Sequence, residues 1–92
     1  MNNIEKIVKE VNDFIRNKIT EIQTLEELDS LHLNLINQTK QNCVRMCENG
    51  FMKKEADEVE EKLCIIIDKL VINKRNWILN EMRCNFKFEF AF

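Results

Sequence analysis

Four cysteines are the residues of this chain whose type and spacing first suggest chemistry. Cys43 and Cys47 are four residues apart, which places two thiols on one face of a helix, and Cys64 and Cys84 follow downstream. Thiolates bind zinc in a tetrahedron at ~2.3 Å, so all of the ligands must converge on one point. Whether these thiols form a zinc site therefore depends on how the chain folds.

His32 is the only histidine, and it would suit general-base chemistry if a carboxylate oriented its ring. A hairpin that turns at Gly50 places His32 opposite Asp68, because the two residues are equidistant from the glycine. Base catalysis also needs a nucleophile, and the nearby hydroxyls of Ser30 and Thr39 have no glycine-rich turn that would build an oxyanion site. We therefore expect a hydrogen-bonded histidine at the edge of the core and no catalytic residue.

The positions of helix breakers predict a hairpin. Proline is absent, and Gly50 is the only glycine among 92 residues. Proline lacks a backbone donor and glycine costs the most backbone entropy, so a chain almost without them favours long helices. In a hairpin centred on Gly50, Cys64 lies about seven residues, or ~10 Å, beyond the position opposite Cys43. Four ligands do not meet, and we expect small, apolar, reduced cysteines and no metal.

The composition is typical of one soluble helical domain over residues 1–92. Hydrophobic residues make up 45%, charged residues 33%, and the net charge is −2. This balance disfavours a protein that binds phosphate backbones by bulk charge, and no run approaches the ~20 apolar residues that span a bilayer. The first residues have no apolar secretory core, so we expect a cytoplasmic, reducing location. No phosphate-binding glycine loop or HExxH motif is present, so neither an enzyme nor a cofactor is predicted.

Apolar spacing and capping signals predict three helices. Over residues 3–21, apolar positions recur at steps of three and four. Thr24 to Glu27 matches a capping box, which starts a second helix over residues 25–48. Gly50 supplies the C-terminal cap of that helix, and a third helix follows over about residues 52–84. The predicted fold class is all-α, an antiparallel three-helix bundle or long helical hairpin.

The third helix is predicted to carry an association surface. Its heptad stripe is Ala56, Val59, Leu63, Ile66, Leu70, Asn73 and Trp77. A second apolar stripe lies one residue over, and at ~48 Å against ~36 Å the third helix outruns the second. One hairpin neighbour cannot cover this surface, so we predict a homo-oligomer or a protein partner. The contact residues assigned to it are Leu63, Ile66, Ile67, Leu70, Val71, Trp77 and Ile78.

The last residues change their period from 3.6 to 2. Phenylalanines alternate with Lys87, Glu89 and Ala91, as on a half-buried strand. This pattern predicts a short extended aromatic tail at residues 86–92. A lone strand is not stable in water, so the tail must bind a partner, pair with a second copy or pack on the bundle. Its rings are Phe86, Phe88, Phe90 and Phe92.

Two functions from different classes remain open. The first is a small non-catalytic interaction module that binds and regulates, inhibits or chaperones a partner protein as a homo-oligomer. The second is a nucleic-acid-binding regulator, since basic residues interleaved with aromatic ones can bind a single strand by stacking. The low net charge favours the first function. The basic residues of the second are Lys69, Lys74, Arg75, Arg83 and Lys87.

Overall fold

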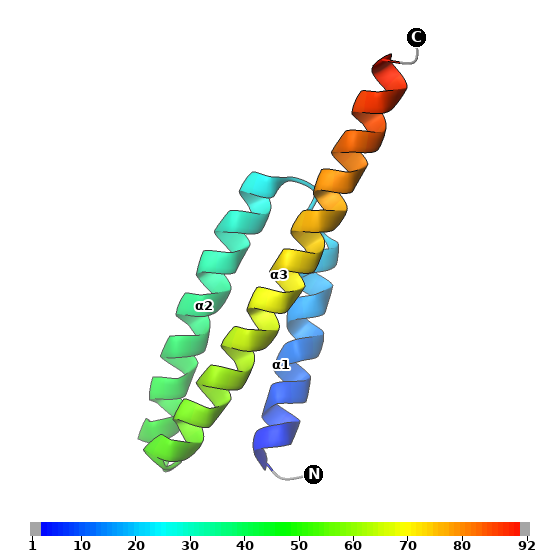
Figure 1. Ribbon diagram of the computed structural model, residues 1–92. Helices are drawn as coiled ribbons and strands as arrows, with labels where there is room; N and C mark the ends of the chain where they lie inside the picture. Colours follow the sequence, from blue (N-terminus) through cyan, green and yellow to red (C-terminus); the bar gives the residue numbers. More distant parts are fainter. Residues whose placement is uncertain (1–2, 91–92) are drawn as a thin grey trace.

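The computed structural model describes residues 3–90, with side chains described for residues 3–83, and consists of three helices (Figure 1). The first helix, α1, spans Asn3–Thr20, α2 spans Leu25–Glu48, and α3 spans Lys53–Phe90. Successive helices run antiparallel, and α3 packs against both of the others (Figure 1). The predicted all-α three-helix bundle is confirmed.

The core consists of two hydrophobic clusters stacked along α3. Val11 of α1 packs against both clusters and joins them into one continuous core. The cluster nearer the α1–α2 turn contains Ile15, Ile19, Leu28, Leu35, Ile67, Val71 and Ile78. The cluster nearer Gly50 contains Cys43, Ala56, Val59 and Leu63.

The buried stripe of α3 departs from the predicted heptad. Ala56, Ile67 and Ile78 recur every eleven residues, and each is at most 4% exposed. Asn73 and Trp77, the last two heptad positions, are exposed instead. A straight helix drifts by ~20° per heptad, whereas an eleven-residue repeat stays close to its natural 3.6-residue turn. The heptad prediction is therefore wrong for the second half of α3. There the second apolar stripe, which contains Ile67, Val71 and Ile78, faces the core.

The turn between α1 and α2 follows its local sequence signals. Thr24 Oγ1 accepts a hydrogen bond from the Glu27 amide at 3.2 Å, as the capping box predicts. Leu28 belongs to the first core cluster, and Ile22 packs against that cluster. The two apolar residues on either side of the cap, Ile22 and Leu28, are thus held by the same group of side chains, as in a hydrophobic staple.

Thr24→Ala should lower the free energy of unfolding by about 1 kcal/mol, because the Glu27 amide loses its acceptor. Urea denaturation followed by circular dichroism measures this loss. Thr20→Ala is a matched control, since the Thr20 hydroxyl donates to the Arg16 carbonyl inside α1 and its removal leaves no amide without an acceptor. The control should change stability by less than about 0.5 kcal/mol. Equal losses in the two variants would show that the cap contributes nothing specific.

The turn between α2 and α3 is closed by a glycine cap. Gly50 has a φ of 98°, which an L side chain rarely adopts. The Phe51 amide donates to the Met46 carbonyl at 3.0 Å, and the Gly50 amide donates to the Cys47 carbonyl at 3.3 Å. This pair of bonds is the Schellman motif, so the C-terminal cap predicted at Gly50 is confirmed.

The end of α3 differs from the prediction. The helix continues to Phe90 rather than ending near residue 84, so an extended tail is wrong for residues 86–90, and Phe92 lies outside the described residues. Each residue added to an existing helix gains one backbone hydrogen bond, and no glycine or proline interrupts the sequence after Gly50. Helix propagation therefore outweighs the period-two pattern. No helix within residues 3–90 is both long enough and apolar enough to cross a membrane.

Candidate functional site

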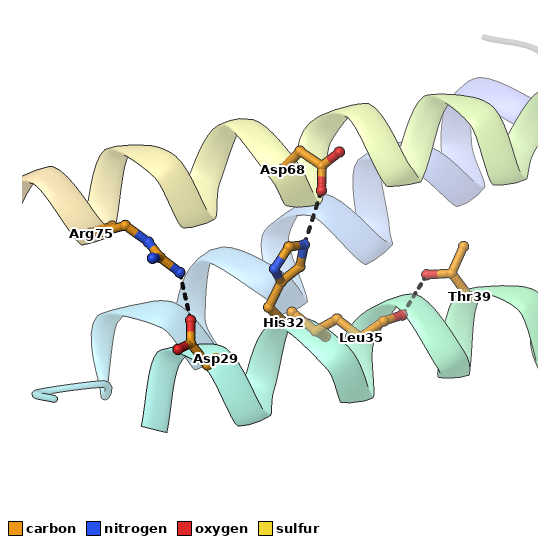
Figure 2. Close-up of polar contacts among 6 residues, drawn as sticks. All are labelled: Asp29, His32, Leu35, Thr39, Asp68 and Arg75. Atoms are coloured by element: carbon orange, nitrogen blue, oxygen red, sulfur yellow. Dashed lines mark hydrogen bonds and ion pairs between the residues drawn. The ribbon is translucent and has the colours of Figure 1, made fainter. Parts of the chain in front are cut away.

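His32 and Asp68 form the pair that the hairpin symmetry predicts. The His32 Nε2 atom lies 2.9 Å from Asp68 Oδ1, and the contact links α2 to α3 (Figure 2). One candidate nucleophile is already engaged, because the buried Thr39 hydroxyl donates to the Leu35 carbonyl at 2.8 Å. His32 thus links α2 to α3, as expected of a hydrogen-bonded histidine at the edge of the core, whereas the Thr39 hydroxyl bonds within α2.

A second polar link between α2 and α3 was not predicted from the sequence. Arg75 donates to Asp29 Oδ1 at 2.5 Å (Figure 2). Symmetry about Gly50 places Asp29 opposite residue 71, and the long Arg75 side chain reaches back by one turn to meet it. Both contacts are substantially exposed to solvent, so each contributes only ~0–1 kcal/mol. Their main effect is to fix the alignment of α2 along α3.

The three described cysteines are free thiols in different surroundings. Burial raises the pKa of the Cys43 thiol, and the nearby Glu60 carboxylate raises it further. The same two causes, in the same order, raise the pKa of the Cys64 thiol, whereas Cys47 is exposed. Across the described side chains, no group of three or more His, Cys, Asp and Glu could hold a metal ion. Cys84 lies outside the described side chains.

Cys43 should react with a disulfide reagent at least about tenfold more slowly than Cys47, because the thiolate is the attacking species and burial hinders both ionisation and access. Two full-length variants test this: one keeps Cys43 as its only cysteine, and the other keeps Cys47 as its only cysteine. The rate at Cys43 should keep rising with pH beyond the range in which an ordinary thiol is fully ionised, because its pKa is raised. In denaturant the two rates should converge. Equal rates in the folded protein would contradict the buried environment.

Most residues predicted to contact a partner are already covered inside the monomer. Ile66 and Leu70 are partly buried, and four others are at most 4% exposed. The prediction that α3 leaves them uncovered is wrong, because it considered one hairpin neighbour, whereas α1 and α2 both pack on α3. The four buried residues are Leu63, Ile67, Val71 and Ile78.

An uncovered apolar surface does occur farther along α3. Trp77, Leu79 and Met82 are 54%, 37% and 56% exposed, respectively. They lie where α3 passes the α1–α2 turn and continues without a neighbouring helix (Figure 1). We call these three residues the C-terminal patch. Among them, the sequence-based prediction had identified only Trp77, because Leu79 and Met82 fall outside both of the stripes that it considered.

The C-terminal patch borders two hollows. One, of about 370 Å³, lies between the α1–α2 turn and α3 and is lined by Ile22, Trp77 and Met82 among others. The other, of about 390 Å³, lies between α1 and α3 and also includes Trp77. Lys74 lines both hollows, and its Nζ atom lies 4.4 Å from the centroid of the Trp77 ring. Such a cation–aromatic contact restrains the ring in an exposed position.

The basic residues of the nucleic-acid alternative do not gather on one face. Arg75 is directed toward α2 by its pairing with Asp29, whereas Lys74 lies over Trp77 on the side of α1. Lys69 and Arg83 are exposed, and Lys87 lies outside the described side chains. A strand-binding surface needs cations that follow one path beside the aromatic rings. The arrangement of Lys74 and Arg75 does not provide such a path.

No protein-family model matches this chain, and no curated protein or solved structure is significantly similar to it. Function must therefore be inferred from the surfaces of the molecule itself.

Proposed function

We propose that this protein is a small non-catalytic interaction module that binds a partner protein and acts as a homo-oligomer. The observation that carries this proposal is the C-terminal patch, in which Trp77, Leu79 and Met82 stay exposed on a helix that outruns its neighbours. Leu79 and Met82 are three residues apart and share one side of α3, whereas Trp77 points to the other side. Large apolar side chains exposed around one end of a helix mark an interaction site. Tryptophan is also among the residues that most often dominate the free energy of binding.

The polar side chains that suggested chemistry support the same proposal. His32 is bound to Asp68, and the Thr39 hydroxyl is bound to a backbone carbonyl, so both have structural partners. A module of this kind acts on its partner by occupying or shielding a surface. Regulation, inhibition and chaperoning are all consequences of such binding.

Sedimentation of the full chain tests this proposal. The wild-type protein should be a dimer or larger at micromolar concentrations, and Met82→Asp should raise its dissociation constant at least tenfold, which corresponds to ~1.4 kcal/mol. Val44→Asp is the matched control, since Val44 is 59% exposed against 56% for Met82, yet lies on α2 near Gly50, far from the patch. Circular dichroism should show that both variants remain helical.

Affinity capture from the native cell extract tests the partner. A protein that is retained by the wild-type chain and by Val44→Asp, but lost with Met82→Asp, would support the module. A chain that is monomeric at high concentration and captures no protein in a manner sensitive to the patch would exclude it.

A further inference from the structure

A groove with an apolar floor runs between α1 and α2. Both helices pack on α3 but make little contact with each other. Two hollows follow this side of α2: the first is lined by α2 and by Ile22 of the α1–α2 turn, and the second is lined by α1, α2 and Leu63 of α3. The first hollow, of about 460 Å³, lies next to the α1–α2 turn. Ile22 and Leu31 supply its apolar lining, and Glu26, Ser30 and Asn34 are among its polar lining residues.

The second hollow continues the groove farther along α2. It measures about 200 Å³ and is lined by α2 residues between Leu35 and Asn42, whereas the first hollow is lined by α2 residues between Glu26 and Asn34. Its floor includes Ile15, Leu35 and Leu63, which are core residues. At 1.5 Å per residue the two hollows are centred ~12 Å apart. We call them together the α1–α2 groove.

A helix is the element that fits this groove. Three antiparallel helices with an apolar-floored groove between two of them resemble a four-helix bundle in which one position is open to solvent. Phe14, which is 51% exposed, stands at the rim of the second hollow, with Lys18 Nζ lying 5.6 Å from its ring centroid. Leu31 and Phe14 would become covered if a fourth helix lay along the groove.

The uncovered end of α3 has the length that the groove requires. Ile78 is buried in the cluster against which Ile22 and Leu25 pack, so the segment without a neighbouring helix begins at Leu79. From Leu79 to Phe90 the helix extends by ~18 Å, which is enough to cross the first hollow and reach the second. The segment is also apolar, because it includes Leu79 and Met82 and, by sequence, Phe86, Phe88 and Phe90.

The charges of the groove and of the helix end are complementary. Glu26 and Glu27 are the charged residues that line the first hollow, and no basic residue lines it. Arg83 is exposed and lies four residues after Leu79, on the same side of the helix. Glu81 lies two residues after Leu79 and so points to the other side, where it lines the hollow beside Trp77. A second copy of the chain would therefore bring a cation to two carboxylates.

We propose that the uncovered end of α3 docks into the α1–α2 groove of a second copy, so that each copy supplies a fourth helix to the other. This inference rests on the proposed function and specifies its self-association. In this dimer the two α1–α2 turns face each other. Each α3 continues past its own turn (Figure 1) and enters the α1–α2 groove of the partner. There it lies beside the partner's α2, on the side that faces away from the partner's own α3. The exchange is reciprocal, and a two-fold axis closes the assembly as a dimer.

Filling the groove in the full chain tests the proposal. Asn34 is exposed and lines the first hollow, so Asn34→Trp should raise the dimer dissociation constant at least about tenfold. Asn37→Trp is the matched control, since Asn37 is exposed on the same helix and lines neither hollow. The Asn37→Trp variant should dimerise as tightly as the wild-type protein. Ser30→Trp fills the same hollow from another position and serves if Asn34→Trp fails to fold.

Mixing two variants gives a sharper result. Asn34→Trp keeps an intact helix end, and Met82→Asp keeps an intact groove, so a mixture can form one of the two docking contacts, whereas neither variant alone can form any. Native mass spectrometry should show heterodimers in excess over either homodimer. Absence of heterodimers would overturn the proposal.

Two further outcomes separate this inference from the proposed function. If Asn34→Trp dimerises as tightly as the wild type while Met82→Asp does not, the helix ends pack on each other, and groove docking is wrong although the interaction module stands. If the wild-type chain is monomeric at all concentrations, docking to a second copy is wrong, and the patch-sensitive capture described above decides the proposed function by itself.

Discussion

Ile67→Asp is expected to lower the free energy of unfolding by more than about 4 kcal/mol and to leave the protein largely unfolded at room temperature. Ile67 is 0% exposed and lies in the cluster that α1, α2 and α3 build together. An aspartate there must either bury an unpaired charge or protonate, and both cost several kcal/mol. A domain of this size is stabilised by only ~5–15 kcal/mol in total.

Ile65→Asp provides the matched control for this prediction. Ile65 is two residues away on the same helix and is 48% exposed. Its replacement should change stability by less than about 1 kcal/mol, since the new carboxylate stays in contact with water. Circular dichroism and urea denaturation of both variants measure the difference. Similar stabilities for the two variants would show that the core of α3 is assigned to the wrong face.

Leu28→Ala is expected to lower the free energy of unfolding by about 3 kcal/mol. Leu28 is 0% exposed, and its removal would leave a cavity where α2 begins, beside Ile22 of the α1–α2 turn. Truncations of this kind cost ~2–5 kcal/mol, because the lost transfer free energy is increased by the cavity that remains. Thermal and urea denaturation followed by circular dichroism measure the loss.

Leu33→Ala is the same chemical change one and a half turns farther along α2, at a side chain that is 63% exposed. It should cost less than about 0.5 kcal/mol. The ratio of the two effects tests which face of α2 packs on the core. A larger loss at Leu33 would mean that this exposed side chain is covered, for example by a second copy of the chain.

Local signals explain which parts of the fold were predictable. The capping threonine at residue 24 and the left-handed Gly50 act within one turn of the backbone, so the bounds of α2 could be predicted from the sequence. The pairing of His32 with Asp68 followed from the same turn, because two helices joined at Gly50 bring equidistant residues together.

Features that depend on a third helix were not predictable in the same way. Whether Ile66 or Ile67 faces the core is decided by where α1 docks, which hairpin symmetry does not specify. The link between Arg75 and Asp29 depends on the reach of a long side chain rather than on the backbone register. At the C-terminus, the alternation of phenylalanines competed with helix propagation, and only the folded chain shows that the helix continues to Phe90.

The central position of α3 has a consequence for synthesis in the cell. α1 and α2 make little contact with each other and depend on α3, which follows both of them in the chain. Most of the stability of a helix in a protein comes from the packing of its apolar face. For α1 and α2, of 18 and 24 residues, that packing surface is supplied by α3. While the chain emerges from the ribosome, the first two helices therefore have no stable surface on which to fold. Folding of the bundle must wait until most of α3 has left the exit tunnel, and until then the apolar faces of α1 and α2 are available to chaperones.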